Sequence, residues 1–295
     1  MKSQTLDLSP ATLETYGREG FLVCESVIDR SEVEEAREAI SMIIRSVHAS
    51  LLRGSPDVEI QPTPADARAN YAGLEVKRVG SEFRLRFEAG TDPRRMGPEE
   101  AEKSVRVLYS YRDEHPVFRR LIDHPNVRGV VEHLVGPGAI LFQDMALIKP
   151  PYIGSEKPWH QDDAYFSYAP LERIVGVWIA LDEARAENGC MHVIPGGHRN
   201  SGLRHFHSSL DCEIVPGRIS AQQAVPIELP PGGALFFSGL LPHQTPVNRS
   251  PLRRRAVQFH YRGADTVKLE AGDYDRVFVD PDGMPASCKA APKGR

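Results

Sequence analysis

The stretch Trp159-His160-Gln161-Asp162-Asp163-Ala164-Tyr165-Phe166 (WHQDDAYF) follows a loop punctuated by proline and glycine. Its histidine and its first aspartate, His160 and Asp162, are two positions apart. Side chains two apart in an extended strand point to the same face, so we expect both to face one point. An imidazole and a carboxylate on one face supply two ligands of a facial metal triad. Such pairs are also common in solvated loops, so the interpretation depends on a third ligand elsewhere.

The third candidate ligand is His243, in the motif FFSGLLPHQTP, 83 positions after His160 (243 minus 160). It follows an apolar run and precedes a turn that contains proline. Two histidines and one carboxylate hold iron(II) and leave adjacent coordination positions open. A structural zinc site would close its sphere with four ligands, usually including thiolates. The pattern therefore favours an oxygenase-type metal centre.

The composition excludes several classes of protein. The chain has 295 residues, of which 41% are apolar, and can bury a sizeable core. Its net charge of −4 and pI near 6.3 argue against a nucleic-acid partner. The four cysteines form no CxxC pair, which fits a reducing compartment. The sequence has no signal peptide and no membrane-spanning run, so we expect a cytoplasmic protein that acts on a small-molecule substrate. The sequence does not indicate an oligomeric state.

The N-terminal part predicts helices around one short strand. Ser9 and Pro10 open a short helix that Gly20 ends, and residues 20–24 predict a strand. A longer helix over residues 31–52 is amphipathic with a period of 3.6, so one face packs on something large. Its apolar positions are Val33, Ala36, Ala39, Ile40, Ile43, Ile44 and Val47.

Residues 53–97 interrupt this pattern with many prolines and glycines. One alternating piece, residues 83–87, predicts a strand. A long irregular insert in a globular chain is often a lid or substrate-binding segment, or else a disordered loop. We favour the lid. Further helices are predicted over residues 98–103, 116–123 and 126–135.

After residue 136 the pattern changes to short apolar or alternating runs between glycine and proline turns. Such a series is typical of an all-β sandwich or barrel. No linker separates the two halves, so we expect a single domain. The predicted strands cover residues 140–148, 174–181, 191–194, 224–229, 234–237 and 254–262.

The last predicted strand offers a cationic anchor. In the motif RRRAVQFHY, Arg254 shares one strand face with Ala256, Gln258 and His260. Arginine presents a rigid fork that matches a carboxylate with two parallel hydrogen bonds. The small Ala256 suits a crowded interior face, so we expect Arg254 to point inward. Its neighbours on the opposite face fit a solvated basic turn.

Four motifs, in order and with matching spacings, make residues 140–261 resemble the phytanoyl-CoA dioxygenase family of iron(II)/2-oxoglutarate-dependent oxygenases. The resemblance implies a double-stranded β-helix (a jelly roll, cupin-like) flanked by N-terminal α-helices. On that basis residues 1–135 form the mainly helical support with a lid at about 53–97, residues 136–265 the jelly-roll core and residues 266–295 a C-terminal extension. The matching motifs are HQDDAYF, VWIALDEARAENGCMHVIPGGH, LLPHQTP and RRRAVQFHY.

The resemblance also implies roles for four further residues. Trp178 matches a tryptophan that lines the cosubstrate pocket, and Thr245 matches a hydroxyl near the 2-oxoglutarate carboxylate. Met145 matches a methionine that packs against the cosubstrate, and Arg106 matches, more loosely, a basic residue that helps to hold it. Without the resemblance, Trp178 and Met145 read as core residues and Thr245 as a turn cap.

The implied chemistry is hydroxylation of an aliphatic C–H bond with release of succinate and CO2. His160, Asp162 and His243 would hold Fe(II), and Arg254 would pair with the far carboxylate of 2-oxoglutarate, with O2 as oxidant. An aspartate at position 162 disfavours halogenation, because halogenases of this superfamily carry a small residue there. Desaturation and ring formation stay open. The substrate is a small molecule or an acyl compound, and its expected contacts include Gln143, Gln161 and Tyr165.

Two other classes of protein remain possible from the sequence. A cupin-type isomerase or hydrolase would use zinc or manganese and would not need Arg254. A non-catalytic jelly-roll protein would only bind a sugar or a partner. Among the histidines outside the triad, we expect His205 and His207 to be solvated or in contact with substrate, and His192 and His260 to be hydrogen-bonded in the core. Asp163 would point away from the metal.

Overall fold

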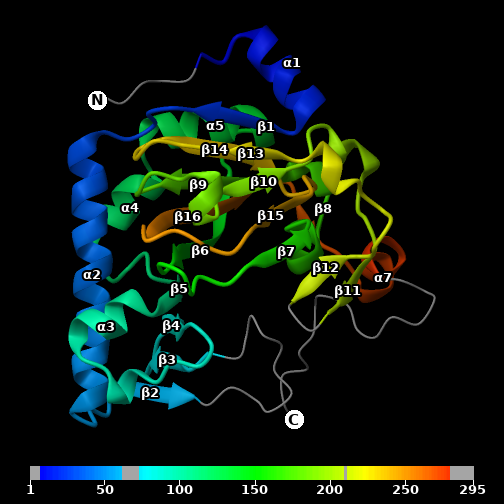
Figure 1. Cartoon of the computed structure of the whole chain (residues 1–295). Coiled ribbons are helices and arrows are strands. Elements are labelled where there is room, and N and C mark those ends of the chain that lie inside the picture. The colour runs from blue at the N-terminus through cyan, green and yellow to red at the C-terminus, as the bar shows by residue number, and fades with distance from the viewer. Residues whose placement is uncertain (1–6, 62–72, 209–210, 280–295) are drawn as a thin grey trace.

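The computed structural model describes residues 7–61, 73–208 and 211–279, and two facing antiparallel β-sheets form its centre (Figure 1). Together they form the expected jelly roll, with helices against one side. The larger sheet has nine strands, in spatial order β1 (Phe21–Cys24), β14 (Ala234–Ser238), β9 (Ile174–Ala180), β16 (Arg254–Arg262), β6 (Ile140–Lys149), β5 (Val105–Tyr109), β4 (Arg84–Phe87), β3 (Glu75–Arg78) and β2 (Val58–Gln61). The smaller sheet has four strands, in order β13 (Val225–Ile227), β10 (Met191–Val193), β15 (His243–Thr245) and β7 (Lys157–His160).

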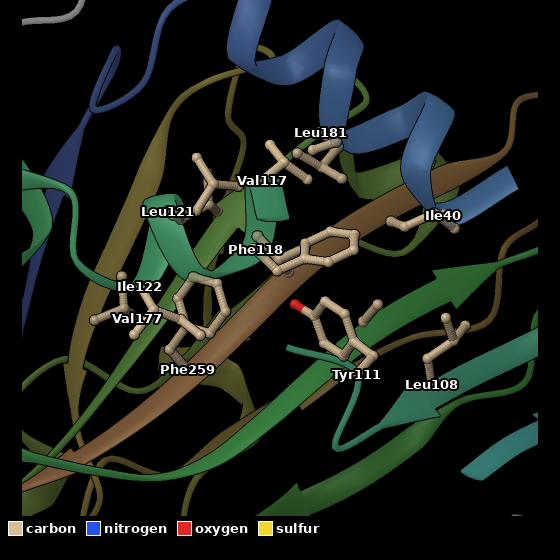
Figure 2. Packing of buried hydrophobic residues seen from close by; sticks show 14 of the residues in the cluster. Ile40, Leu108, Tyr111, Val117, Phe118, Leu121, Ile122, Val177, Leu181 and Phe259 are labelled. Atoms are coloured by element: carbon tan, nitrogen blue, oxygen red, sulfur yellow. The ribbon is translucent and has the colours of Figure 1, made fainter. Parts of the chain in front are cut away.

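Helices cover the outer face of the larger sheet. They are α2 (Arg30–Leu52), α3 (Pro98–Lys103), α4 (Pro116–Ile122) and α5 (Pro125–Val135). Helix α2 begins at Asp29, whose carboxylate accepts from the backbone N–H of Glu32 while the Glu32 side chain accepts from the N–H of Asp29. Its apolar stripe and that of α4 pack on the outward side chains of the sheet, and Phe118 of α4 lies between Ile40 of α2 and Phe259 of β16 (Figure 2).

The two faces of the large sheet follow the two-residue period of its strands. Along β9, Val177 points to the helices and Trp178 points to the smaller sheet, and the pattern continues in β14 and β16. The interior between the sheets is a second apolar cluster. The strand ends that enclose the cavity described below are therefore held between two packed layers.

Charged side chains join the helical layer to β16. Arg255 pairs with Asp182 at 2.8 Å, and Asp182 also meets Arg37 of α2 at 3.2 Å. Arg253 pairs with Glu102 of α3 at 2.9 Å. The expected solvated basic turn is therefore wrong, because both flanking arginines are largely buried and paired with carboxylates.

The irregular segment at residues 53–97 contains three strands that extend the large sheet. Strands β2, β3 and β4 pair in sequence and join β5. Their inward residues, among them Val76 and Leu85, are buried. Strand β4 agrees with the strand predicted at residues 83–87. The prediction of irregular structure is wrong for β2 and β3, because prolines and glycines around these four-residue strands hid their alternation. Residues 62–72, the rest of the expected lid, lie outside the described residues.

The other predicted elements agree with the structure, including a helix α1 (Pro10–Glu19) that Gly20 ends in a left-handed conformation (φ 86°). Beyond β16 the chain forms β17 (Val267–Lys268) and α7 (Ala271–Phe278), and the rest of the expected C-terminal tail is not described. Tyr274 of α7 donates a hydrogen bond to the carbonyl of Ala164 at 2.5 Å. Among the described residues, no helix is long and apolar enough to cross a membrane. Cys24 and Cys190 are buried free thiols.

Candidate metal centre and cosubstrate cavity

Two neighbouring strands of the smaller sheet bring the two candidate histidines together. His160 ends β7 and His243 begins β15, and the two residues are direct cross-strand partners. Their ring centroids are 4.1 Å apart. Asp162 does not continue the strand as expected. It has helical angles (φ −64°, ψ −32°) and precedes the short helix α6 (Asp163–Phe166), so a turn rather than strand alternation brings its carboxylate to the histidines.

The three side chains present one ligand atom each to a common point. Asp162 Oδ1 lies 3.4 Å from His160 Nε2 and 3.7 Å from His243 Nε2, and the three ligand atoms lie within 4.8 Å of one another. The Nδ1 of His160 bonds the carbonyl of Pro158 at 2.7 Å, and that of His243 bonds the carbonyl of Leu241 at 2.9 Å. Each Nδ1 therefore carries the proton, which leaves each Nε2 lone pair available to a metal ion.

The charges at this point suit a cation. Burial, with His160 beside it, lowers the pKa of His243 to about 3, so the ring is neutral at physiological pH. Burial alone would raise the pKa of Asp162, but His243 and His260 hold it well below the usual range. A neutral imidazole pair and an ionised carboxylate are the donor set that a divalent transition metal requires.

His260 is a site residue that the sequence interpretation placed in the core without a role. Its Nε2 lies 2.7 Å from Asp162 Oδ2 and 3.0 Å from the side-chain amide of Gln258. The ring is fully buried and sits between Phe142, Phe166 and Phe237. It therefore holds one oxygen of Asp162 and leaves the other for the metal. The signal was present in the sequence, because His260 shares the strand face of Arg254.

Asp163 turns away from the cluster, as expected. It is fully buried, and neither carboxyl oxygen has a hydrogen-bond partner among the described residues. Burial and the neighbouring Asp162 raise the pKa of Asp163 well above the usual range, so its charged form is disfavoured. Its oxygen lies where a Cβ at residue 239 would stand, which explains the need for Gly239.

A cavity of about 220 Å³ opens beside the triad and contains most of the predicted cosubstrate residues. Arg254 enters it from β16 and is 1% exposed. The Nε and Nη1 of Arg254 are buried without a hydrogen-bond partner among the described residues. Burial lowers its pKa to about 10, so the guanidinium remains charged. A buried fork with unused donors fits a carboxylate ligand. The other predicted cosubstrate residues that line the cavity are Arg106, Met145 and Thr245.

Trp178 lies behind Arg254 rather than in the lining of the cavity. The guanidinium carbon of Arg254 is 5.2 Å from the ring centroid. The indole therefore supports the arginine from the apolar interior through a cation–π contact. Arg106 lines the cavity and pairs with the buried Glu88 at 3.2 Å.

Only two of the three expected substrate contacts line the cavity. Gln143 and Tyr165 line the cavity, and Gln143 Oε1 has no partner among the described residues. Gln161 does not: its amide bonds the carbonyls of Ser201 and Leu240 and the N–H of Leu203, so it braces a loop. Residue 161 follows the end of β7, and its side chain is bonded within the fold and is not among the lining residues.

Lys157 and Asp211 are among the lining residues that the sequence did not predict. Lys157 Nζ bonds the Tyr165 hydroxyl at 2.7 Å and pairs with the buried Asp211. His205 is neither solvated nor a lining residue, because it is 1% exposed and its Nε2 accepts the N–H of Gln161. Burial lowers the pKa of His205 to about 3. His192, expected in the core, is only partly buried.

The fold and the cluster together define a class: jelly-roll proteins with a histidine–aspartate–histidine site between the two sheets. The chain belongs to the phytanoyl-CoA dioxygenase (PhyH) family, whose model matches residues 16–256. It is 28% identical over 282 residues to phytanoyl-CoA dioxygenase domain-containing protein 1 of Rattus norvegicus, covering 90% of this chain and 94% of that one.

Solved structures share the fold. EvdO2 from Micromonospora carbonacea var. aurantiaca, complexed with 2-oxoglutarate, superposes with a TM-score of 0.62 at 23% identity and covers 94% of this chain and 99% of its own. SnoK, a non-heme alpha ketoglutarate dependent carbocyclase from nogalamycin biosynthesis, has a TM-score of 0.61 at 19% identity, with 91% and 89% covered.

Proposed function

We propose that the protein is a non-haem Fe(II)/2-oxoglutarate-dependent dioxygenase that hydroxylates an aliphatic C–H bond of a small molecule or acyl substrate. The observation that carries the proposal is the set of three ligand atoms from His160, Asp162 and His243, all buried and within 4.8 Å of one another. Three ligands leave the remaining coordination positions of an iron ion for a bidentate cosubstrate and dioxygen.

Arg254 supports 2-oxoglutarate as that cosubstrate. The cosubstrate carries two carboxylates, and the one far from the metal needs a cationic partner in the cavity. The buried guanidinium lines the same cavity as the triad and has unused donors. Met145 and Thr245, which the family resemblance assigns to the cosubstrate, also line this cavity. A cupin-type hydrolase or isomerase would have no use for a buried, unpaired arginine.

When bound together, iron, 2-oxoglutarate and dioxygen supply an oxidant that removes a hydrogen atom from a C–H bond and yields succinate and CO2. The residues of this chain orient the reactants. His260 fixes Asp162, and the apolar walls of Phe166 and Met191 limit water near the metal. Gln143 and Tyr165 offer polar contacts to a substrate on the open side of the cavity. We favour hydroxylation as the outcome, with ring formation, as in the carbocyclase neighbour, as its nearest competitor.

An anaerobic titration tests the proposal. Adding Fe(II) and then 2-oxoglutarate is expected to give a weak charge-transfer band in the visible region, and His160→Ala is expected to abolish it. The exposed His133→Ala on α5 is the matched control and should keep the band. A metal spectrum that does not change when 2-oxoglutarate is added would instead indicate a cupin-type hydrolase or isomerase. If the protein bound no metal, the result would indicate a non-catalytic jelly-roll protein.

A turnover assay then addresses the reaction. Candidate small molecules and acyl compounds are screened in air for succinate release that depends on substrate. Products that gain one oxygen atom support hydroxylation, whereas products that lose two hydrogen atoms point to ring formation or desaturation.

A further inference from the structure

A second buried basic side chain, that of Lys149, lies beside Arg254. Lys149 is the last residue of β6, and its Cα is the direct cross-strand partner of Arg254 in β16. Side chains opposite each other in an antiparallel pair lie on the same face of the sheet, here the face toward the cavity. Lys149 is 4% exposed and lines the cavity together with Arg254.

Close packing fixes the conformation of the Lys149 side chain. A Cβ at Gly189 would lie 2.7 Å from Lys149 Cδ, and a Cβ at Gly154 would lie 2.9 Å from Lys149 Cβ. The two glycines thus leave room for the stem between their turns. At its end, Nζ donates to the backbone carbonyl of Ser155 and to that of Thr245, the latter at 3.3 Å. The amine is therefore fixed at the cavity wall rather than free to reach solvent.

Neither cation has a carboxylate partner. Among the described residues, no carboxylate oxygen lies within the 4.0 Å of an ion pair from either Lys149 or Arg254. The nearest buried acid, Glu88, already pairs with Arg106. A buried guanidinium and a buried amine side by side, with no carboxylate partner, favour binding of an anion between them.

Burial and the nearby charges disfavour the protonated form of Lys149. Burial first, then Arg254 and Arg106, lower the pKa of Lys149 well below its usual value, and Glu88 and Glu156 only partly oppose them. A neutral amine has two N–H groups, and these meet the two carbonyls. The third position of the nitrogen has no acceptor in the part of the chain that the structure describes.

We propose that Lys149 is the second cationic contact for the far carboxylate of the cosubstrate, and that it takes up one proton from solvent when a dicarboxylate binds. The proposal rests on the proposed function. In the empty cavity the amine stays neutral and donates to Ser155 and Thr245. In the complex the added proton completes an ammonium group whose third N–H points to the carboxylate that Arg254 also binds.

The direction of the pH dependence follows. The anion raises the pKa of Lys149 in the complex above its value in the free protein. Binding is therefore strongest below the free-state pKa and weakens as pH rises, by up to about tenfold per unit, until the pKa of the complex is reached.

Calorimetry of the Fe(II)-loaded protein under nitrogen measures the proton directly. 2-Oxoglutarate is titrated at one pH in phosphate and in Tris, whose ionisation enthalpies differ. The expected result is a buffer-dependent heat that corresponds to uptake of about one proton. The ligand control is 2-oxopentanoate, which has the same five carbons and lacks the far carboxylate; it should bind more weakly and take up none.

Three variants distinguish the charge of Lys149 from its hydrogen bonds to the two backbone carbonyls. Lys149→Gln keeps two N–H donors for the carbonyls but has no charge, so it should bind 2-oxoglutarate about tenfold or more weakly and without proton uptake. Lys149→Arg, always charged, should bind without proton uptake. The exposed Lys103→Gln at the end of α3 is the matched control and should behave as the wild type. Thermal melts of each variant confirm folding.

The outcomes are distinguishable from a failure of the proposed function. If neither 2-oxo acid binds the iron-loaded protein, the dioxygenase proposal itself is wrong. If 2-oxoglutarate binds with heats that do not depend on buffer, or if Lys149→Gln binds it as tightly as the wild type, only the role of Lys149 is overturned.

Discussion

His260 is not one of the three candidate metal ligands, but it positions one of them, Asp162. It donates to the Asp162 oxygen that does not face the histidines and is itself enclosed by three phenylalanines. Without this bond the carboxylate could rotate or present both oxygens to the ion. The geometry of the open coordination positions therefore depends on a side chain from the opposite sheet.

We expect His260→Ala to weaken metal binding by about 10–100-fold, because Asp162 loses the donor that orients it. Titration with Co(II), followed by its visible absorption, gives the dissociation constant. His260→Gln, which can still donate to the carboxylate, should recover part of the affinity. Equal affinities of the wild type and the alanine variant would contradict the role.

The candidate ligands were predictable from residue types and order, but their local geometry was not. His160 and Asp162 converge because the strand ends and a turn begins, whereas the expectation was an unbroken strand. Gln161 was misplaced for the same reason. Periodicity shows which face a residue takes inside an element and fails at the element's end, where one pair of dihedral angles redirects the side chain.

At the scale of elements, long periodic segments were predictable and short ones were not. Helix α2 and strand β16 occupy nearly the predicted residues, because many positions repeat one pattern. Strands β2 and β3, with four residues each, were missed, whereas the equally short β4 was predicted from its alternation. The order of strands depends on partners far apart in the chain, which no local pattern encodes.

The contact between α2 and β16 gives a prediction with a pH dependence. Burial alone would raise the pKa of Asp182, but Arg255 and Arg37 lower it. A carboxylate with a lowered pKa stabilises the fold above its unfolded pKa, and the effect is lost as pH falls through the folded value. Asp182→Asn should therefore cost about 1–3 kcal/mol in the free energy of unfolding at pH 7.

Urea denaturation at pH 7 and near pH 3 checks this prediction. The difference between wild type and Asp182→Asn should shrink at the lower pH, which lies below the usual pKa of an aspartate and therefore favours the unfolded state of the wild type. The exposed Asp113→Asn serves as the control, with little effect at either pH. A difference that is the same at both pH values would show that the charge of Asp182 does not contribute.

At the scale of the whole molecule, the metal would join strands that are remote in sequence. β7 and β15 pair through His160 and His243, and β16 reaches the same point through His260. An ion that binds only the folded state stabilises all of these contacts together. At 100 times its dissociation constant it adds about 2.7 kcal/mol.

We therefore expect Fe(II) or Co(II) to raise the melting temperature by roughly 5 °C and EDTA to reverse the rise. Differential scanning calorimetry under nitrogen gives the measurement. His243→Ala should melt at one temperature with and without metal. A shift of the same size in this variant would place the bound ion elsewhere.

The hydrogen bond from Tyr274 to Ala164 links the turn that carries Asp162 to a helix 110 residues further along the chain. Because a ribosome makes the chain from its N-terminus, all three metal-binding side chains leave the exit tunnel before α7 does. The three candidate ligands are therefore synthesised before Tyr274, whose hydrogen bond supports the turn that carries Asp162. A metal ion that requires the finished geometry would therefore bind only after α7 has been made.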